Sequence, residues 1–343
     1  MEYTKDFKER DELLAQLVDR GLDVPDRDEA LAFLTRMGYF RSGAYRYVFR
    51  QLLPPHEVDE RLRQYRSDSY VPGASIEHVI TLAEFDAKLA RVCLEGLLDF
   101  EVRLRAAIAH TLAARHVAAH TIEAHLDAHM CSQPSGEHTK LEAWLETCRA
   151  AIRSGAEDED FIAHHLTKYP GHAVPIWALT EVLSFGKLPF LFELMQTSDA
   201  REVARAFGFT HPRRFGAVLR MMVDFRNTCA HGSRLFNRAF KRVLAIKANE
   251  THGDMLDHLI ESGFTRAPKP RQRLYIYAAV LAFMLRSHSS GSIWHRTFRT
   301  QIRKFTITLP SPAGGSLLSV EASMGFPDDW EGLQLWSADP GQS

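Results

Sequence analysis

The sequence contains few cysteines and no long apolar run, and these two scarcities exclude several classes of protein. Four cysteines occur among 343 residues, at Cys93, Cys131, Cys148 and Cys229. Their spacing matches neither the short pairs of a zinc site nor the framework of a small secreted disulfide protein. No stretch reaches the roughly 18 uninterrupted apolar residues of a transmembrane helix, and the first residues are charged where a signal peptide is apolar. We therefore expect a cytoplasmic protein with reduced thiols and no membrane association.

Net charge is also nearly absent. Lys and Arg number 42 against 43 Asp and Glu, which gives a net charge of -1, whereas a general nucleic-acid binder carries a basic excess. Any nucleic-acid site must therefore be local. Cations gather between residues 213 and 242, where Asp224 is the only acidic residue. Most charge runs are solvated helix faces, but this one surrounds the motif described below, which favours phosphate contact.

A histidine-rich stretch raises the question of a metal. His116 and His120, like His125 and His129, have the spacing at which two imidazoles on one helix can bind one ion. No glutamate completes the His-Glu-x-x-His pattern of a metalloprotease, and histidines on a polar surface insertion are the simpler interpretation. We expect no metal and no cofactor. A metal hydrolase built on these histidines is the alternative, and bound zinc would reveal it.

Helical periodicity runs through most of the chain and predicts an all-α fold. Helical segments are expected at residues 5–20, 27–37, 75–115, 174–185, 188–195, 213–230 and 274–286. The segment at 75–115 is either one long helix or a kinked pair bent at Gly96. The expected organisation is a small helical N-terminal unit at residues 1–70, a helical bundle at 71–306 with a helical insertion at about 116–170, and an irregular C-terminal tail at 307–343.

Arg226-Asn-Thr-Cys-Ala-His231 is the segment with the clearest chemistry. An arginine followed by four to six residues and a histidine occurs at five other places, so the spacing alone is weak evidence. This occurrence follows an apolar helical run and precedes Gly232, a usual stop signal for a helix. Asn227 and His231 lie one turn apart on the same helix face, where the amide can hold the imidazole. The long side chain of Arg226 can reach the same place.

These residue types can cleave RNA without a metal. An imidazole can take a proton from a ribose oxygen or give one to it, and a guanidinium can neutralise the charge that builds on phosphorus. The dipole at a helix C-terminus favours the protonated imidazole, which suits a general acid. The alternative is structural: Arg226 and His231 cap the helix and pair with acidic neighbours such as Asp224. We expect Cys229, inside the motif, to be a small buried residue and not a nucleophile.

Three segments, in this order along the chain, resemble the Abi-like proteins, an abortive-infection family of the HEPN superfamily of helical ribonucleases. They are Met37–Arg50, Ile176–Leu188 and Phe225–Arg238, and the likeness spans roughly residues 8 to 306. The resemblance implies a HEPN-like helical bundle with metal-independent endoribonuclease activity. The family's activity is usually carried by a dimer that brings two motifs together, in phage defence or as a toxin of a toxin-antitoxin system. Many members have a second histidine after the catalytic one, where this chain has Gly232.

By matching position, the resemblance makes Arg226, Asn227 and His231 the catalytic residues. The expected reaction is attack of a ribose 2′-hydroxyl on the adjacent phosphodiester, which leaves a 2′,3′-cyclic phosphate. His231 acts as general acid or base, Arg226 stabilises the pentavalent phosphorus and Asn227 orients the ring. One imidazole cannot easily serve both proton transfers, which favours a homodimer. Further residues near the motif are expected to contact RNA: Arg214, Arg220, Arg234, Asn237 and Arg238.

The expected partners are an RNA substrate, such as a tRNA or a small regulatory RNA, a second copy of the chain, and an antitoxin RNA or protein. A non-catalytic RNA-binding or protein-interaction module of the same fold is the rival hypothesis, and binding without cleavage would distinguish it.

Three other segments carry structural expectations. One of Glu101, Arg103 and Arg105 is expected to contact the motif across the bundle, although pairing on the helix surface is the default. The aromatic rings of Tyr39–Arg50 either bind unpaired bases or dock the N-terminal unit on the main body, and docking is favoured. Phe326–Trp330 in the tail is typical of a docking arm.

Overall fold

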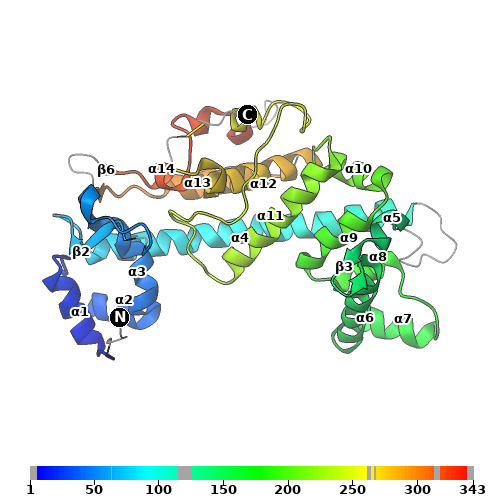
Figure 1. The fold of residues 1–343 in the computed structure, drawn as a ribbon, viewed down its shortest axis with the longest axis horizontal. Helices are drawn as coiled ribbons and strands as arrows, with labels where there is room; N and C mark the ends of the chain where they lie inside the picture. Colours follow the sequence, from blue (N-terminus) through cyan, green and yellow to red (C-terminus); the bar gives the residue numbers. More distant parts are fainter. Residues whose placement is uncertain are drawn as a thin grey trace.

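The computed structural model describes residues 6–62, 64–114, 126–260, 264–265, 268–289, 291–312 and 317–337. These residues form fourteen α-helices and three short antiparallel strand pairs, which confirms the predicted all-α fold (Figure 1). Within the same ranges, no helix combines the length and the apolar character needed to cross a bilayer. Of the paired histidines in the insertion, His116, His120 and His125 lie outside the described residues.

The helices are α1 Arg10–Asp19, α2 Arg27–Met37, α3 Tyr39–Arg46, α4 Ile76–Ala113, α5 Ala128–Ser132, α6 Lys140–Asp158, α7 Asp160–Lys168, α8 Ile176–Val182, α9 Leu188–Leu194, α10 Thr197–Ala206, α11 Pro212–Ala230, α12 Leu274–His288, α13 Trp294–Arg303 and α14 Val320–Met324. The strand pairs are β1 Arg50–Leu52 with β2 Arg66–Tyr70, β3 Pro134–Ser135 with β4 His138–Thr139, and β5 Leu309–Pro310 with β6 Leu317–Leu318. Helix α10 has no counterpart among the predicted segments, because its buried face consists mostly of small residues such as Ala200 and Ala204 and gives a weak apolar pattern.

Helix α4 is the spine of the fold. It crosses the molecule from end to end and contacts α3, α8, α10, α11, α12 and α13 (Figure 1). Its buried residues recur at three- and four-residue steps from Ile76 to Leu112, so one apolar face extends over its length. Ser75 begins the helix, because its Oγ accepts the N–H of Glu77 (3.2 Å) and its own N–H donates to His78 Nδ1 (3.2 Å). Residues 76–113 therefore form one continuous helix of 38 residues and not a pair.

Gly96 lets a second helix approach α4 closely. Trp294 of α13 packs over this glycine, where an added Cβ would lie 2.4 Å from the indole nitrogen. The indole N–H donates to the carbonyl oxygen of Val92 (2.8 Å). The structure thus shows a packing role for Gly96 within the continuous helix.

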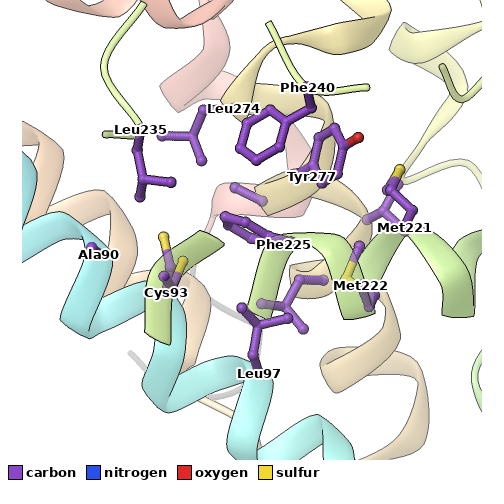
Figure 2. Close-up of a cluster of buried hydrophobic side chains, with 14 of the residues drawn as sticks. Ala90, Cys93, Leu97, Met221, Met222, Phe225, Leu235, Phe240, Leu274 and Tyr277 are labelled. Atoms are coloured by element: carbon purple, nitrogen blue, oxygen red, sulfur yellow. The ribbon is translucent and has the colours of Figure 1, made fainter. Parts of the chain in front are cut away.

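Aromatic and apolar side chains fix α11 between α4 and α12 (Figure 2). Phe225 of α11 lies edge-on to Phe240, with ring centroids 5.7 Å apart, and to Tyr277 of α12, at 5.5 Å. Phe240 stacks on Tyr277 at 4.2 Å. Cys93 and Leu97 of α4 complete the cluster. Since these contacts hold one face of α11, the orientation of its exposed face is fixed.

The N-terminal helices dock on α4 through buried rings, as the favoured interpretation of this segment predicts. Tyr45 and Phe49 are almost fully buried. Phe40 is the exception, because this residue is 97% exposed. Helix α3 therefore packs against α4 and leaves the aromatic ring of Phe40 exposed to solvent.

The C-terminal tail packs back onto the body, which confirms the expected docking arm. Phe326, Trp330 and Trp336 are buried. The ring of Trp330 lies 4.9 Å from Phe326 and 5.4 Å from Trp336 between centroids. The indole N–H of Trp336 donates to the hydroxyl of Tyr275 on α12 (3.2 Å).

We predict that Gly96→Ala destabilises the protein by about 1–3 kcal/mol, because the added methyl group has to displace the Trp294 indole. Denaturant unfolding measures the change. Gly332→Ala is the matched control, since a Cβ there meets open space and the backbone is not left-handed. Equal stability of the two variants would contradict the close packing of α13 on α4.

A partly buried histidine predicts acid sensitivity. His258 bonds the hydroxyl of Tyr275 (2.8 Å), and burial lowers the pKa of His258 to about 4. In the unfolded chain the His258 imidazole takes up a proton near pH 6.5, whereas in the folded protein the same imidazole stays neutral. The contribution of His258 to the free energy of unfolding is therefore fully present above about pH 6.5 and is lost as the pH falls towards 4. The loss amounts to about 3 kcal/mol at most.

We therefore expect His258→Gln to flatten the decline in unfolding free energy between about pH 7 and about pH 4.5. His252→Gln, at an exposed histidine nearby, should leave the decline unchanged. A His258→Gln variant with the pH dependence of the unmodified protein would show that this imidazole is not its source.

Candidate active site

Helix α11 ends in a defined cap at the motif. His231 is the C-cap residue, and Gly232 follows with a left-handed φ of 57°. The N–H of Gly232 donates to the carbonyl of Cys229 (3.0 Å), and the N–H of Ser233 donates to that of Thr228 (2.9 Å). This pair of bonds is the Schellman arrangement, which favours glycine after the cap. The predicted helix end at His231 is confirmed, and it leaves the imidazole exposed.

Arg226 is held by two partners. Its Nη1 donates to the side-chain oxygen of Asn227 (3.3 Å), and its Nε faces Glu101 Oε2 on α4 at 3.9 Å. About a third of the side chain (35%) stays exposed. Asp224, the acidic neighbour that the structural alternative pairs with Arg226, instead accepts from Arg242 Nε (2.6 Å).

Asn227 orients the guanidinium in this structure. Its side-chain oxygen accepts from Arg226, while its backbone carbonyl accepts the N–H of His231 (3.0 Å). The predicted contact between the Asn227 amide and the imidazole ring is therefore replaced by a contact with the arginine. Asn227 and His231 are both exposed, and they share one face of α11.

The carboxylate that faces Arg226 is also linked to α8, through Arg105. Glu101, whose side chain is 10% exposed, accepts from Arg105 Nη2 at 2.5 Å through Oε1. Arg105 in turn donates to the carbonyl oxygens of Thr180 and Glu181 in the last turn of α8, where the final carbonyls of a helix need partners. Of the three residues considered on α4, Glu101 is the one that faces the motif.

Asp86 fixes the loop that follows the motif. This carboxylate of α4 is almost fully buried and accepts the N–H groups of Leu235 (3.0 Å) and Phe236 (2.6 Å) and the hydroxyl of Tyr45 (2.7 Å). Burial raises the pKa of Asp86, while these three bonds and the charge of Arg234 act in the opposite direction. The loop after His231 is thereby attached to both α4 and α3.

Helix α3 also contacts the cap of α11 directly. Arg41 donates to the carbonyl oxygen of Gly232, and Arg234 donates to the carbonyl of Ala44 on α3 (3.1 Å). The exposed ring of Phe40 is the chain neighbour of Arg41. The N-terminal block and the motif, about 190 residues apart, are thus joined in space.

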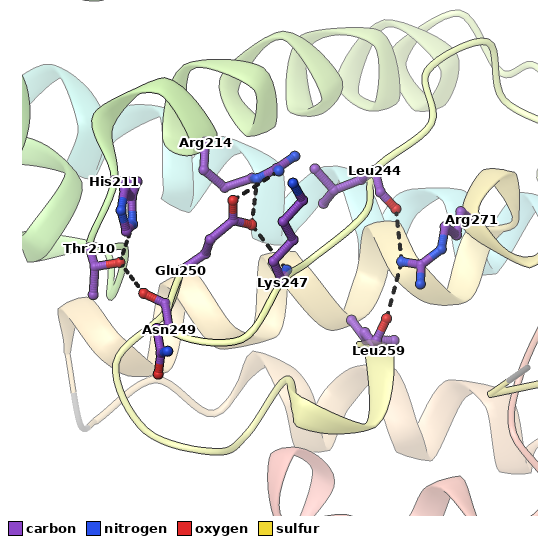
Figure 3. A network of polar contacts seen from close by, with 9 residues as sticks. All are labelled: Thr210, His211, Arg214, Leu244, Lys247, Asn249, Glu250, Leu259 and Arg271. Carbon is purple, nitrogen blue, oxygen red and sulfur yellow. Dashed lines mark hydrogen bonds and ion pairs between the residues drawn. The ribbon is translucent and has the colours of Figure 1, made fainter. Parts of the chain in front are cut away.

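Four of the predicted RNA-contacting residues have partners within the protein. Arg214, in the first turn of α11, pairs with Glu250 at 2.7 Å (Figure 3). The guanidinium of Arg234 is partly buried, which lowers its pKa. Asn237 accepts from Arg273 (2.9 Å), and Arg238 donates to the carbonyl of Arg234 (3.5 Å). Their contact with RNA stays a prediction. In the structure, Arg214 binds the segment around Glu250, and the other three residues make contacts from the loop that follows His231.

Arg220 is placed differently. Its side chain is 42% exposed and lies on the same face of α11 as Asn227 and His231. Its nearest acid is Glu193 of α9, at 3.7 Å. Arg220 is therefore the predicted RNA-contacting residue that is most available to an anion on this face.

The thiol inside the motif is buried, as expected. Cys229 lies beside Cys93 of α4, and burial together with this hydrogen-bonded neighbour raises the pKa of Cys93. A buried thiol of this kind favours a packing role. In the described part of the chain, no group of three or more His, Cys, Asp and Glu side chains is arranged to hold a metal ion.

Two residues that hold the site together, Asp86 and Arg41, were not predicted from the sequence. Asp86 does leave a signal, because it occupies a buried register of α4 between Leu82 and Leu89, where an apolar residue is expected. Arg41 leaves none, because its partner is a backbone carbonyl.

Comparison with known families places the chain. Residues 32–237, more than half of its length, match the family described as Abi-like protein. The chain belongs to the Abi-like family. The segment Met37–Arg50, which contains α3, and all but the last residue of Phe225–Arg238 in this Abi-like protein fall within the match. The family indicates a role in abortive infection or defence. Neither a curated protein nor a solved structure matches the sequence.

We predict that Asp86→Asn destabilises this Abi-like protein by about 1–3 kcal/mol, because the amide nitrogen cannot accept and leaves a buried donor without a partner. Denaturant unfolding and hydrogen exchange at the Leu235 and Phe236 amides measure the effect. Glu95→Gln, at an exposed position of α4, is the control. Unchanged protection of the two amides would show that the loop does not depend on this carboxylate.

Proposed function

We propose that the protein is a metal-independent endoribonuclease of the HEPN type, which acts in phage defence by abortive infection or as the toxin of a toxin-antitoxin system. The observation that carries the proposal is the end of α11, where a partly exposed guanidinium and an exposed imidazole occur within six residues. The membership of the Abi-like family supports the biological role.

The proposed chemistry uses these groups at a single phosphodiester. His231 takes the proton of a ribose 2′-hydroxyl as that oxygen attacks the adjacent phosphorus, or gives a proton to the departing 5′ oxygen. Arg226 stabilises the negative charge of the pentavalent phosphorus. Asn227 and Glu101 orient the guanidinium, because their oxygens are its partners. The products are a 2′,3′-cyclic phosphate and a free 5′-hydroxyl.

A homodimer completes the proposal. The two proton transfers call for a base on one oxygen and an acid on the other, and one imidazole does not easily serve both. Because His231 lies at an exposed helix end, a second copy of the chain can bring its own imidazole to the same phosphate. An antitoxin RNA or protein that covers this end would restrain the activity.

We expect RNA cleavage to persist in EDTA and to fall by about 10²-fold or more in Arg226→Ala and in His231→Ala. The measurement is cleavage of a labelled RNA together with identification of the cyclic phosphate end. Sequencing of RNA ends after brief expression then identifies the substrate and the cut site.

Arg205→Ala and His211→Ala are the matched controls, because this exposed pair has the same residue types at a similar spacing. Cleavage that is lost on chelation, or retained in His231→Ala, would contradict the proposed chemistry. RNA binding without cleavage would identify a non-catalytic binding module. A specific activity that stays constant on dilution to a monomeric protein would contradict the dimer.

A further inference from the structure

Three adjoining hollows form a groove along α11. The first, of about 260 Å³, lies between α9 and α11, and the second, of about 450 Å³, lies between the start of α11 and the helices α9 and α10. The third, of about 350 Å³, separates α11 from residues 241–244. Arg220 lines all three. We call these three hollows, which meet at this arginine, the groove.

Positive charge exceeds negative charge in the groove. Two acids line it, Glu193 and Asp224, against four cations: Arg213, Arg220, Lys241 and Arg242. Both acids are already paired, because Glu193 Oε1 accepts from Lys140 of α6 (2.6 Å) and Asp224 accepts from Arg242 Nε. A guanidinium has five N–H donors, so Arg242 keeps donors for a second partner. The charge balance favours a polyanion.

An apolar floor accompanies the charges. Pro189, Phe190 and Val223 line the first hollow, and the half-buried Phe190 ring is held next to the Trp144 ring, with centroids 5.8 Å apart. A fixed ring beside cations is the combination that binds an unpaired base and its phosphates. A duplex keeps its bases stacked inside, out of reach of such a ring.

The face of α11 that borders the groove continues to the motif. Arg220, Asp224, Asn227 and His231 follow one another at steps of four, three and four residues, which places them on one face of α11. At a rise of 1.5 Å per residue, Asp224 lies about 10 Å along the helix axis from His231. A strand in the groove can thus continue to the end of α11.

We propose that this groove binds an unpaired stretch of RNA next to the phosphate that is cleaved. Phe190 stacks on one base, and Arg220 and Arg242 contact the phosphates that flank it. That the bound RNA lies next to the cleaved phosphate rests on the proposed function, whereas the binding of unpaired RNA in the groove does not depend on it. The groove makes the protein selective for single-stranded segments of its substrate.

The test uses the full chain with His231→Ala, so that RNA is bound without being cut. Anisotropy of a labelled unpaired oligoribonucleotide measures affinity against salt concentration. Adding Arg220→Ala and Arg242→Ala should weaken binding by about 10-fold or more and lower the salt slope by about 1–2. Phe190→Leu should weaken binding by about 5- to 100-fold, because it removes the ring, whereas Phe190→Tyr keeps a ring and should bind like the parent.

Arg205→Ala on α10 is the charge-matched control and should change neither affinity nor slope, and melting curves confirm that each variant is folded. A duplex of the same sequence should bind more weakly and be insensitive to Phe190→Leu. Groove variants that bind like the parent would overturn this inference and leave the cleavage chemistry standing. Cleavage by His231→Ala, with groove variants still impaired in binding, would overturn the chemistry and leave the groove standing.

Discussion

The buried carboxylate of Asp86 is the interaction on which the shape of the site depends. Taking a charge out of water is unfavourable unless donors replace the solvent, and here the donors come from two distant segments, the α3 hydroxyl of Tyr45 and the loop amides of Leu235 and Phe236. The same loop begins directly after the C-cap of α11. A single acid on the spine helix therefore determines how the N-terminal helices, the motif and the following loop are arranged around one another.

The two candidate catalytic side chains are constrained to different degrees. Arg226 lies against a buried carboxylate and a neighbouring amide, and that carboxylate is itself bonded to an arginine that caps α8. His231 ends its helix in solvent, and its ring is exposed. An arginine set in advance suits electrostatic stabilisation, which costs least when the charge does not have to move. An exposed imidazole suits a group that waits for substrate or for a second copy of the chain.

The sequence predicts what is local and misses what is long-range. The helices α4, α11 and α12 and the cap at Gly232 are predictable, because apolar periodicity and stop signals lie within the segments themselves. The partner of Asp86 is not, because the loop amides lie 149 and 150 residues farther along the chain. For the same reason a cluster of cations around the motif looks uniform in the sequence, whereas the fold pairs Arg214 with Glu250 at 2.7 Å and leaves Arg220 42% exposed, at 3.7 Å from Glu193.

Gly232 couples two ends of the family match. Its backbone is left-handed, its carbonyl is bound by Arg41, and a Cβ at this position would lie 3.1 Å from the guanidinium. Any side chain here has to tolerate that backbone, and its Cβ requires the flexible end of Arg41 to shift by a few tenths of an ångström. Homologues that carry a larger residue directly after the motif histidine should therefore place the arginine side chain of α3 differently, so that the two positions are expected to vary together through evolution.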